Sequence, residues 1–186
     1  MFRKISQEDI ENIKIPKEAY DYAKSIGRPV PELEDTIAED PEYSYRYAVD
    51  VIRGRFEKGE SAIAQNTDLS YWYAENVIKG RFVGGEDAIA QRPGSSYFYA
   101  ENIIKGRFEK GEDMIAQDPL YSCWYARDII KGRFEKGEKV IAQDPELSYE
   151  YARDVIKDRF EEGERAIAQD PEWSKRYAEE FGLEEF

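Results

Sequence analysis

The side chains that most often carry catalysis are scarce in this chain. It contains no histidine and one cysteine, Cys123. Histidine is the commonest general base and a frequent metal ligand, so its absence counts against both kinds of site. A cysteine nucleophile needs a thiolate whose pKa is lowered by neighbouring cations or a helix start. Cys123 stands where related segments have tyrosine, so we interpret it as a packing substitution and expect no catalytic residue, no cofactor and no metal site.

Arginine, glutamate and serine recur in register along the chain. The repeated residues are Arg55, Arg81, Arg107, Arg133 and Arg159, then Glu60, Glu86, Glu112, Glu138 and Glu164, then Ser44, Ser70, Ser96, Ser122, Ser148 and Ser174. A row of alternating charges could bind an extended partner. A residue that recurs in every unit, however, usually has a structural role in the fold. We therefore interpret the arginines and glutamates as ion pairs that fix each unit against the next. The serines have no histidine to activate them and are interpreted as small packing residues.

The net charge limits the kinds of partner. The 186 residues include 27 basic and 40 acidic side chains, a formal charge of −13. Direct nucleic-acid binding is not expected, because phosphate contacts need clustered lysine and arginine. The opposite hypothesis is an acidic mimic that blocks a nucleic-acid-binding protein, although Lys79, Lys105 and Lys131 interrupt any uniform acidic face. Aromatic residues make up 14%, too many for a disordered acidic chain.

No segment predicts membrane insertion or export. The mean hydropathy is −0.78 and there is no long apolar run, so we expect no membrane-spanning helix. The first residues, MFRKISQEDIENIKI, lack the apolar core of a signal peptide. A single cysteine fits a reducing compartment. We therefore expect a cytoplasmic protein.

A repeat of 26 residues organises the chain. The dipeptide Tyr-Ala recurs at that spacing, beginning at Tyr47, Tyr73, Tyr99, Tyr125, Tyr151 and Tyr177. A degenerate copy begins at Tyr22, and the last copy stops after half a unit. Repeated units that cannot bury their apolar faces alone stack on one another, and the end units differ because they meet water. The sequence predicts an all-α fold, an α-solenoid of stacked two-helix repeats with degenerate N- and C-terminal capping units.

The expected domain is a single one over residues 1–186. Residues 1–36 form an N-terminal cap and degenerate repeat, residues 37–170 the regular repeats, and residues 171–186 a C-terminal half repeat. Within each repeat, Asp-Pro predicts the start of a first helix of about 13 residues. A glycine is expected to end it in the left-handed conformation. These glycines are Gly54, Gly80, Gly106 and Gly132, with Asp158 in the fifth copy.

The apolar faces follow from the helical period of 100° per residue. In the first helix Ser122, Tyr125, Ala126, Ile129 and Ile130 share one face. The second helix, of about nine residues, places Phe134, Gly137 and Ile141 together. The glycine is expected to allow close approach between helices.

The motif SYxYAxxVIKGRFxxGExxIAxDP resembles a short helical repeat of tailed-bacteriophage proteins. Segments 104–108 and 148–152 carry it most clearly, and the likeness spans about residues 40–178. The family has no shared activity to carry over. The resemblance implies expression inside a bacterial host, and it favours takeover of a host protein or inhibition of an antiviral defence protein.

The position just before each repeated tyrosine departs from the pattern. Its occupants are Arg46, Trp72, Phe98, Trp124, Glu150 and Arg176. This position lies nearly opposite the apolar face, so three central repeats would direct an aromatic ring to solvent as a ridge. Exposed aromatic clusters mark interaction surfaces. The alternative is that the rings pack against an adjacent helix.

A second departure falls beside the first of these rings. Val83-Gly84 replaces the usual Glu-Lys, and Arg92 and Gly94 enter the following turn. We therefore predict partner binding by Trp72, Phe98, Trp124, Val83 and Arg92. The function expected is a non-enzymatic, protein-binding repeat protein directed at a host protein. The two other hypotheses are the acidic nucleic-acid mimic and a structural or scaffold component of a virion.

Overall fold

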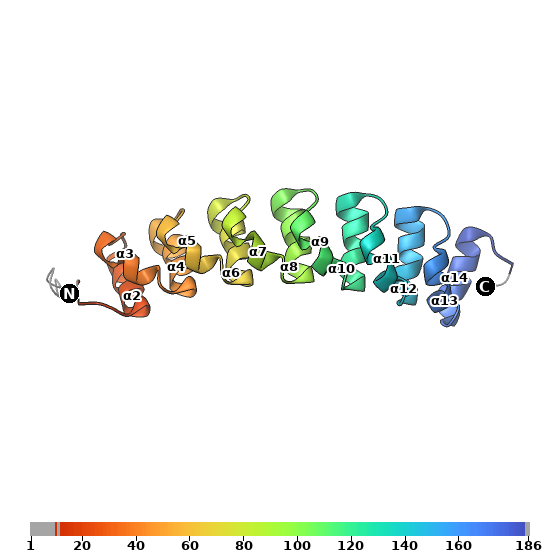
Figure 1. Cartoon of the computed structure of the whole chain (residues 1–186), viewed down its shortest axis with the longest axis horizontal. Coiled ribbons are helices and arrows are strands. Elements are labelled where there is room, and N and C mark those ends of the chain that lie inside the picture. The colour runs from red at the N-terminus through yellow and green to blue at the C-terminus, as the bar shows by residue number, and fades with distance from the viewer. Residues whose placement is uncertain (1–9, 11, 185–186) are drawn as a thin grey trace. The chain divides into compact units, whose positions relative to one another are not determined.

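The computed structural model describes residues 10 and 12–184, and all regular structure in them is helical (Figure 1). The first part of the predicted N-terminal cap, residues 1–9 and 11, and residues 185–186 of the C-terminal half repeat lie outside the described residues. The chain divides into two compact units between Ile89 and Ala90. The single domain over residues 1–186 stays a prediction.

From residue 12 onward, the first unit contains three helix pairs. Its elements are α2 (Pro16–Ile26), α3 (Pro31–Ile37), α4 (Pro41–Tyr47) with a π-helical continuation (Ala48–Ile52), α5 (Glu60–Ile63), α6 (Thr67–Trp72) with its continuation (Tyr73–Ile78), and α7 (Glu86–Ile89). Single 3₁₀ turns at Glu57–Gly59 and Val83–Gly85 lead into α5 and α7. The pair α2 and α3 is the predicted degenerate repeat.

The second unit repeats the pattern. Its elements are α8 (Pro93–Phe98) with a π-helical continuation (Tyr99–Ile104), a 3₁₀ turn (Glu109–Gly111) with α9 (Glu112–Ile115), α10 (Pro119–Trp124) with its continuation (Tyr125–Ile130), α11 (Glu135–Ile141), α12 (Pro145–Glu150) with its continuation (Tyr151–Ile156), α13 (Glu161–Ile167) and α14 (Pro171–Phe181). The fold is therefore all-helical with a repeating two-helix pattern, as the sequence predicts. Among the described residues no helix is long and apolar enough to cross a membrane.

Helix starts follow the predicted Asp-Pro rule. Asp118 accepts a hydrogen bond from the backbone N–H of Tyr121, and Asp144 does the same from Leu147. Pro119 and Pro145 occupy the first helical position, where the missing N–H costs nothing. These caps fix where each first helix begins.

Helix ends differ from the prediction. The left-handed residue is the one before each expected position, with φ between 54° and 60°: Arg53, Lys79, Lys105, Lys131 and Lys157. Gly106 instead donates its backbone N–H to the carbonyl of Ala100, six residues back. The turn is one residue wider than an ordinary helix-ending turn because the helix has already widened to a π-helix. The prediction for Gly54, Gly80, Gly106 and Gly132 is therefore wrong, and a glycine is not required at Asp158.

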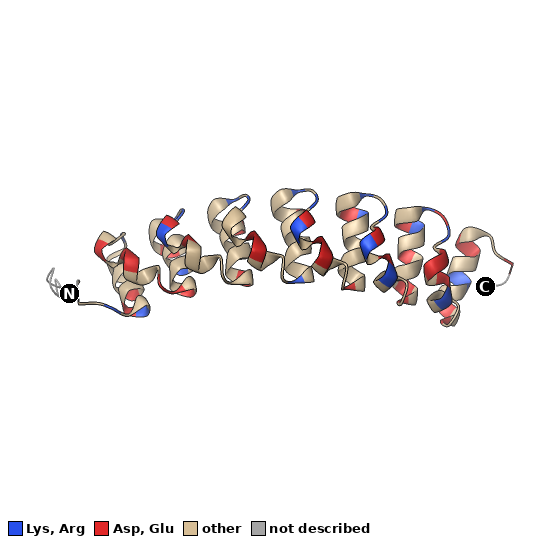
Figure 2. Ribbon diagram, viewed as in Figure 1, with Lys and Arg blue, Asp and Glu red and all other residues tan. Residues whose placement is uncertain are grey.

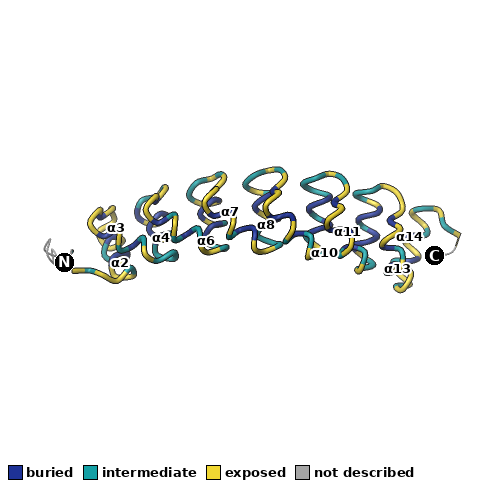
Figure 3. The backbone as a smooth tube through the Cα atoms, in the orientation of Figure 1, coloured by how far each residue is buried: buried dark blue, intermediate teal, exposed yellow. Residues whose placement is uncertain are grey.

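The π-helical segments also correct the predicted apolar face. Ser122, Tyr125 and Ala126 are buried as expected, whereas Ile129 and Ile130 are only half-buried. The prediction used 3.6 residues per turn, and a π-helix has more. Figure 3 shows the buried stretches within the helix pairs and the exposed residues at their turns.

The two helices of a repeat approach closely at a serine and a glycine. The Ser122 hydroxyl donates to the carbonyl oxygen of Ile115, in the preceding repeat, at 2.8 Å. A Cβ atom added at Gly137 would lie 2.6 Å from the Cβ of Ser122 and 2.7 Å from the ring of Phe134. Ser122 is fully buried, as are Ser44, Ser70, Ser96 and Ser148. The packing interpretation of the serines and the close approach at the glycine are both confirmed.

Candidate partner-binding surfaces

A recurring tyrosine forms hydrogen bonds with two groups of the repeat before it. The hydroxyl of Tyr125 accepts a hydrogen bond from the backbone N–H of Phe108 at 2.8 Å and donates one to Glu112 at 3.2 Å. Arg107 donates to the same carboxylate at 2.8 Å. The same arrangement recurs at Tyr73 in the first unit and at Tyr151 and Tyr177 in the second.

This network assigns the recurring arginines and glutamates to the architecture. The pairs Arg55–Glu60, Arg133–Glu138 and Arg159–Glu164 each join two groups of one repeat through two hydrogen bonds. The tyrosine hydroxyl ties neighbouring repeats together, a role the sequence prediction missed. The sequence feature that indicates this role is the constant spacing of 17 residues between each phenylalanine and the tyrosine that follows it.

Cys123 is buried, with 1% of its surface exposed. Burial raises the pKa of its thiol to about 12, and the nearby Glu150 carboxylate acts in the same direction. The sulfur faces the carbonyl oxygen of Leu147 at 4.0 Å. A thiol held protonated in this way is a packing group, as interpreted from the sequence.

The position before each repeated tyrosine is a surface position that differs between terminal and central repeats. In the first regular repeat Arg46 pairs with Glu42, one helical turn earlier, at 2.6 Å. In the last, Arg176 pairs with Glu172 at 2.7 Å and covers the ring of Trp173 at 4.7 Å. In both repeats the arginine at this position therefore has its partner within the chain. The three repeats that carry an aromatic residue at this position replace both members of the pair, and the next repeat replaces only the arginine.

Trp72 occupies this position in the first unit. The residue is 46% exposed, and its ring lies 6.3 Å from that of Tyr45 on α4, the first helix of the preceding repeat. Both sequence alternatives therefore hold in part, because one side of the indole packs on a neighbour while the other meets solvent. The ring is large enough to contribute to an interface.

Phe98 and Trp124 belong to the second unit, where they join an aromatic cluster with Tyr97 and Tyr121. Trp124 lies 5.8 Å from the rings of both tyrosines, and Phe98 lies 5.2 Å from Tyr97. Phe98 is 39% exposed and Trp124 half-buried. Trp72 lies in the other unit, so a ridge of all three rings stays a prediction.

Gly94 makes room for this cluster. The other repeats have Glu42, Asp68, Leu120, Glu146 and Glu172 at its position. A Cβ atom at Gly94 would lie 2.9 Å from the hydroxyl oxygen of Tyr121. The departure noted in the sequence thus has a packing reason.

Beside Trp124 lies a groove of about 510 Å³ between α10 and α12. Its apolar wall consists of Pro119, Leu120, Trp124 and Leu147, and Leu120 is 38% exposed. The remaining lining residues are all acidic: Asp118, Asp144, Glu146 and Glu150. The groove is therefore lined by apolar and acidic side chains together.

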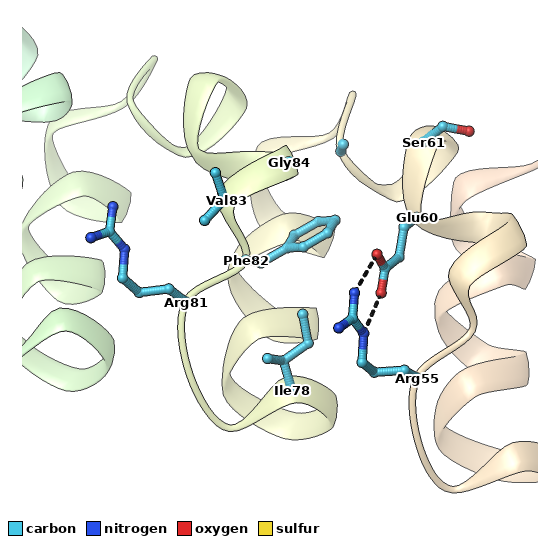
Figure 4. A pocket seen from close by; sticks show the side chains of 9 residues that line it. Arg55, Glu60, Ser61, Ile78, Arg81, Phe82, Val83 and Gly84 are labelled. Carbon is cyan, nitrogen blue, oxygen red and sulfur yellow. Dashed lines mark hydrogen bonds and ion pairs between the residues drawn. The ribbon is translucent and has the colours of Figure 1, made fainter.

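A second pocket, of about 430 Å³, lies in the first unit beside Val83 (Figure 4). Val83 is 66% exposed, and Ile78 and Phe82 line the pocket with it. The Arg55–Glu60 ion pair forms its other wall.

The pocket lies where an ion pair between neighbouring repeats is missing. Elsewhere a lysine pairs with an aspartate of the repeat before it, Lys58 with Asp35 at 2.9 Å and Lys136 with Asp113 at 2.7 Å. At this junction Gly84 and Ser61 stand at the two positions. Loss of both charged side chains accounts for an open, partly apolar surface at Val83.

Arg92 is exposed at the N-cap position of α8 and makes no side-chain cap bond there. The guanidinium group has no acceptor, so it cannot replace the capping aspartate of other repeats. Arg92 and Trp72 line neither of the two pockets described above. The structure thus brings Phe98 and Trp124 into one cluster and leaves Arg92 outside it.

Charges of both signs occur in the helix pairs, and the turns that follow the first helices carry basic residues (Figure 2). Within the described residues no group of three histidine, cysteine, aspartate or glutamate side chains is arranged to hold a metal ion.

Comparisons of the chain with protein-family models, with curated proteins and with solved structures find no match.

Proposed function

We propose that this chain is a non-enzymatic α-solenoid that binds a protein partner through the surface around Phe98 and Trp124, with Trp72 and Val83 as further contacts. The observation that carries the proposal is the replacement at one surface position. The terminal repeats fill it with the ion pairs Arg46–Glu42 and Arg176–Glu172. The central repeats fill it with aromatic rings, which supply much of the binding energy at protein interfaces.

The resemblance to tailed-phage repeat proteins supports a host protein as the partner. In this proposal the chain acts inside the bacterial cell and inhibits or redirects its target, for example a defence protein. Binding rather than catalysis is favoured because the one cysteine is buried with a raised thiol pKa.

The test compares partner capture from host lysate by wild type and by the triple variant Trp72→Ala, Phe98→Ala and Trp124→Ala. We expect a protein that wild type captures to be lost by the variant, while circular dichroism shows unchanged helical content. The matched control is Arg46→Ala with Arg176→Ala, which alters the same repeat position in the terminal repeats. Capture that survives the triple change would contradict the proposal.

The acidic mimic and the virion component stay predictions. A mimic would lose binding steeply with added salt and would be displaced by DNA or RNA. A virion component would co-purify with phage particles. Neither has an observation in its favour comparable to the aromatic replacements.

A further inference from the structure

The groove between α10 and α12 carries a charge arrangement that the terminal repeats do not have at the same positions. Glu146 and Glu150 lie one turn apart, where the terminal repeats have a glutamate and an arginine. Like charges at this spacing are destabilising, whereas the glutamate–arginine pair is stabilising. Neither carboxylate forms an ion pair or hydrogen bond with a cation among the described residues, although the charge of Glu150 acts on the guanidinium of Arg127 and raises its pKa. Arg127, which belongs to the preceding repeat, donates two hydrogen bonds to Asp128 at 2.9 Å.

The fold itself shows which group fits such a place. Arg176 donates to Glu172 and lies over the indole of Trp173 at 4.7 Å. The groove offers the same two elements, a glutamate carboxylate and an indole, in Glu150 and Trp124. A guanidinium group stacks on an aromatic face and pairs with carboxylates at once. The missing component is therefore a cation.

The apolar wall requires more than a cation. Leu120 is exposed and the buried Leu147 lines the same groove as the indole of Trp124. A ligand that covers this wall needs an apolar side chain beside its positive charge. None of the residues that line the groove is basic.

From these observations we infer that the groove binds a basic segment of a protein partner, in which an arginine or lysine neighbours an apolar residue. The cation lies against Trp124 and the carboxylates of Glu146 and Glu150, and the apolar residue covers Leu120. The inference rests on the proposed protein-binding function and specifies the chemistry of its partner.

A random peptide library displayed against the full-length chain tests the inference. We expect the enriched peptides to contain arginine or lysine beside an apolar residue and to bind more weakly at high salt. Glu150→Arg restores the glutamate–arginine pair of the terminal repeats, so it should fold normally and lower peptide affinity at least about tenfold, since it replaces an attraction by a repulsion. Leu120→Ser should weaken the same peptides. Glu135→Arg, an exposed site outside the groove, is the matched control and should leave affinity unchanged.

Three results would overturn the inference: no enrichment, enriched peptides without basic residues, or equal binding by Glu150→Arg. Self-association of wild type that Glu150→Arg abolishes would assign the groove to a second copy and overturn it as well. A different result would separate the two proposals. If uncharged peptides bind, and their affinity falls with Trp124→Ala but not with Glu150→Arg, the protein-binding function is supported. Only the basic character of the partner is then contradicted.

Discussion

The hydroxyl of Tyr125 lies 2.8 Å from the backbone nitrogen of Phe108, which belongs to the preceding repeat. Both groups are buried, and the same hydroxyl donates to Glu112. One phenol therefore satisfies a backbone donor and a carboxylate of its neighbour. This geometry gives each repeat a specific tie to the previous one.

Replacing Tyr125 by phenylalanine should destabilise the second unit by about 1–3 kcal/mol, because it leaves a buried N–H without an acceptor. Urea unfolding followed by circular dichroism measures the loss. Tyr121→Phe is the control, since that hydroxyl has no hydrogen bond among the described residues. Equal midpoints for the two variants would show that the tie contributes nothing.

Gly137→Ala should also destabilise the protein, by about 1–3 kcal/mol, because the added Cβ atom would overlap Ser122 and Phe134. Gly132→Ala offers a close comparison. Its Cβ atom would have only Ile130 near it, at 4.0 Å, and its φ is not positive. Its thermal midpoint should stay near that of wild type. A wild-type midpoint for Gly137→Ala would contradict the close approach of the two helices.

The repeat allowed much of the fold to be predicted. Helix starts, buried serines and the close approach at Gly137 all follow from local capping and steric rules. The helix ends do not, because the switch to a π-helix depends on packing of the whole turn. For this reason the left-handed residue is Lys105 rather than Gly106, and Ile129 is less buried than the 3.6-residue period implies.

The candidate surface could be predicted only in part. Phe98 and Trp124 were found because they break the repeat pattern. The groove depends on contacts between α10 and α12, and the role of Gly94 depends on the position of Tyr121. A single sequence contains both signals, but only the structure shows which repeats they join.

Low pH should weaken the interactions of the Glu138 carboxylate with Arg133 and Tyr151. Burial raises the pKa of this carboxyl, but hydrogen bonds from Arg133 and Tyr151 outweigh burial and hold the pKa below its ordinary value. The folded state thus binds the proton less readily than the unfolded state. The stabilisation is complete above the unfolded pKa, about 4.5, and is lost as pH falls through the folded value.

Urea unfolding of wild type and Glu138→Gln at several pH values checks this. The stability difference should be largest near pH 7 and should narrow below about pH 4. Glu135→Gln, at an exposed site in the same helix, controls for general loss of charge. A difference that stays constant with pH would contradict the assignment.

Cys123 should resist alkylation. Because the thiol is buried with a pKa raised to about 12, iodoacetamide at pH 8 should modify the native protein very slowly and the urea-unfolded protein rapidly. Mass spectrometry follows the added mass with time. Rapid modification of the native protein would show that the thiol is accessible and would reopen a reactive role.

Gly94→Glu tests whether the aromatic cluster depends on its glycine. The first added atom would already lie 2.9 Å from the Tyr121 hydroxyl oxygen, so the tyrosine ring must move. Trp124 rests against that ring and should become more exposed, although overall stability should change little because the far end of one side chain can yield. Fluorescence in a background with Trp72→Phe and Trp173→Phe isolates Trp124, and its emission should shift to longer wavelength. Gly106→Glu, where a Cβ atom meets nothing within 4 Å, should leave the emission unchanged. Identical spectra for both variants would mean that Tyr121 does not position Trp124, and the surface would then owe its shape to Tyr97 alone.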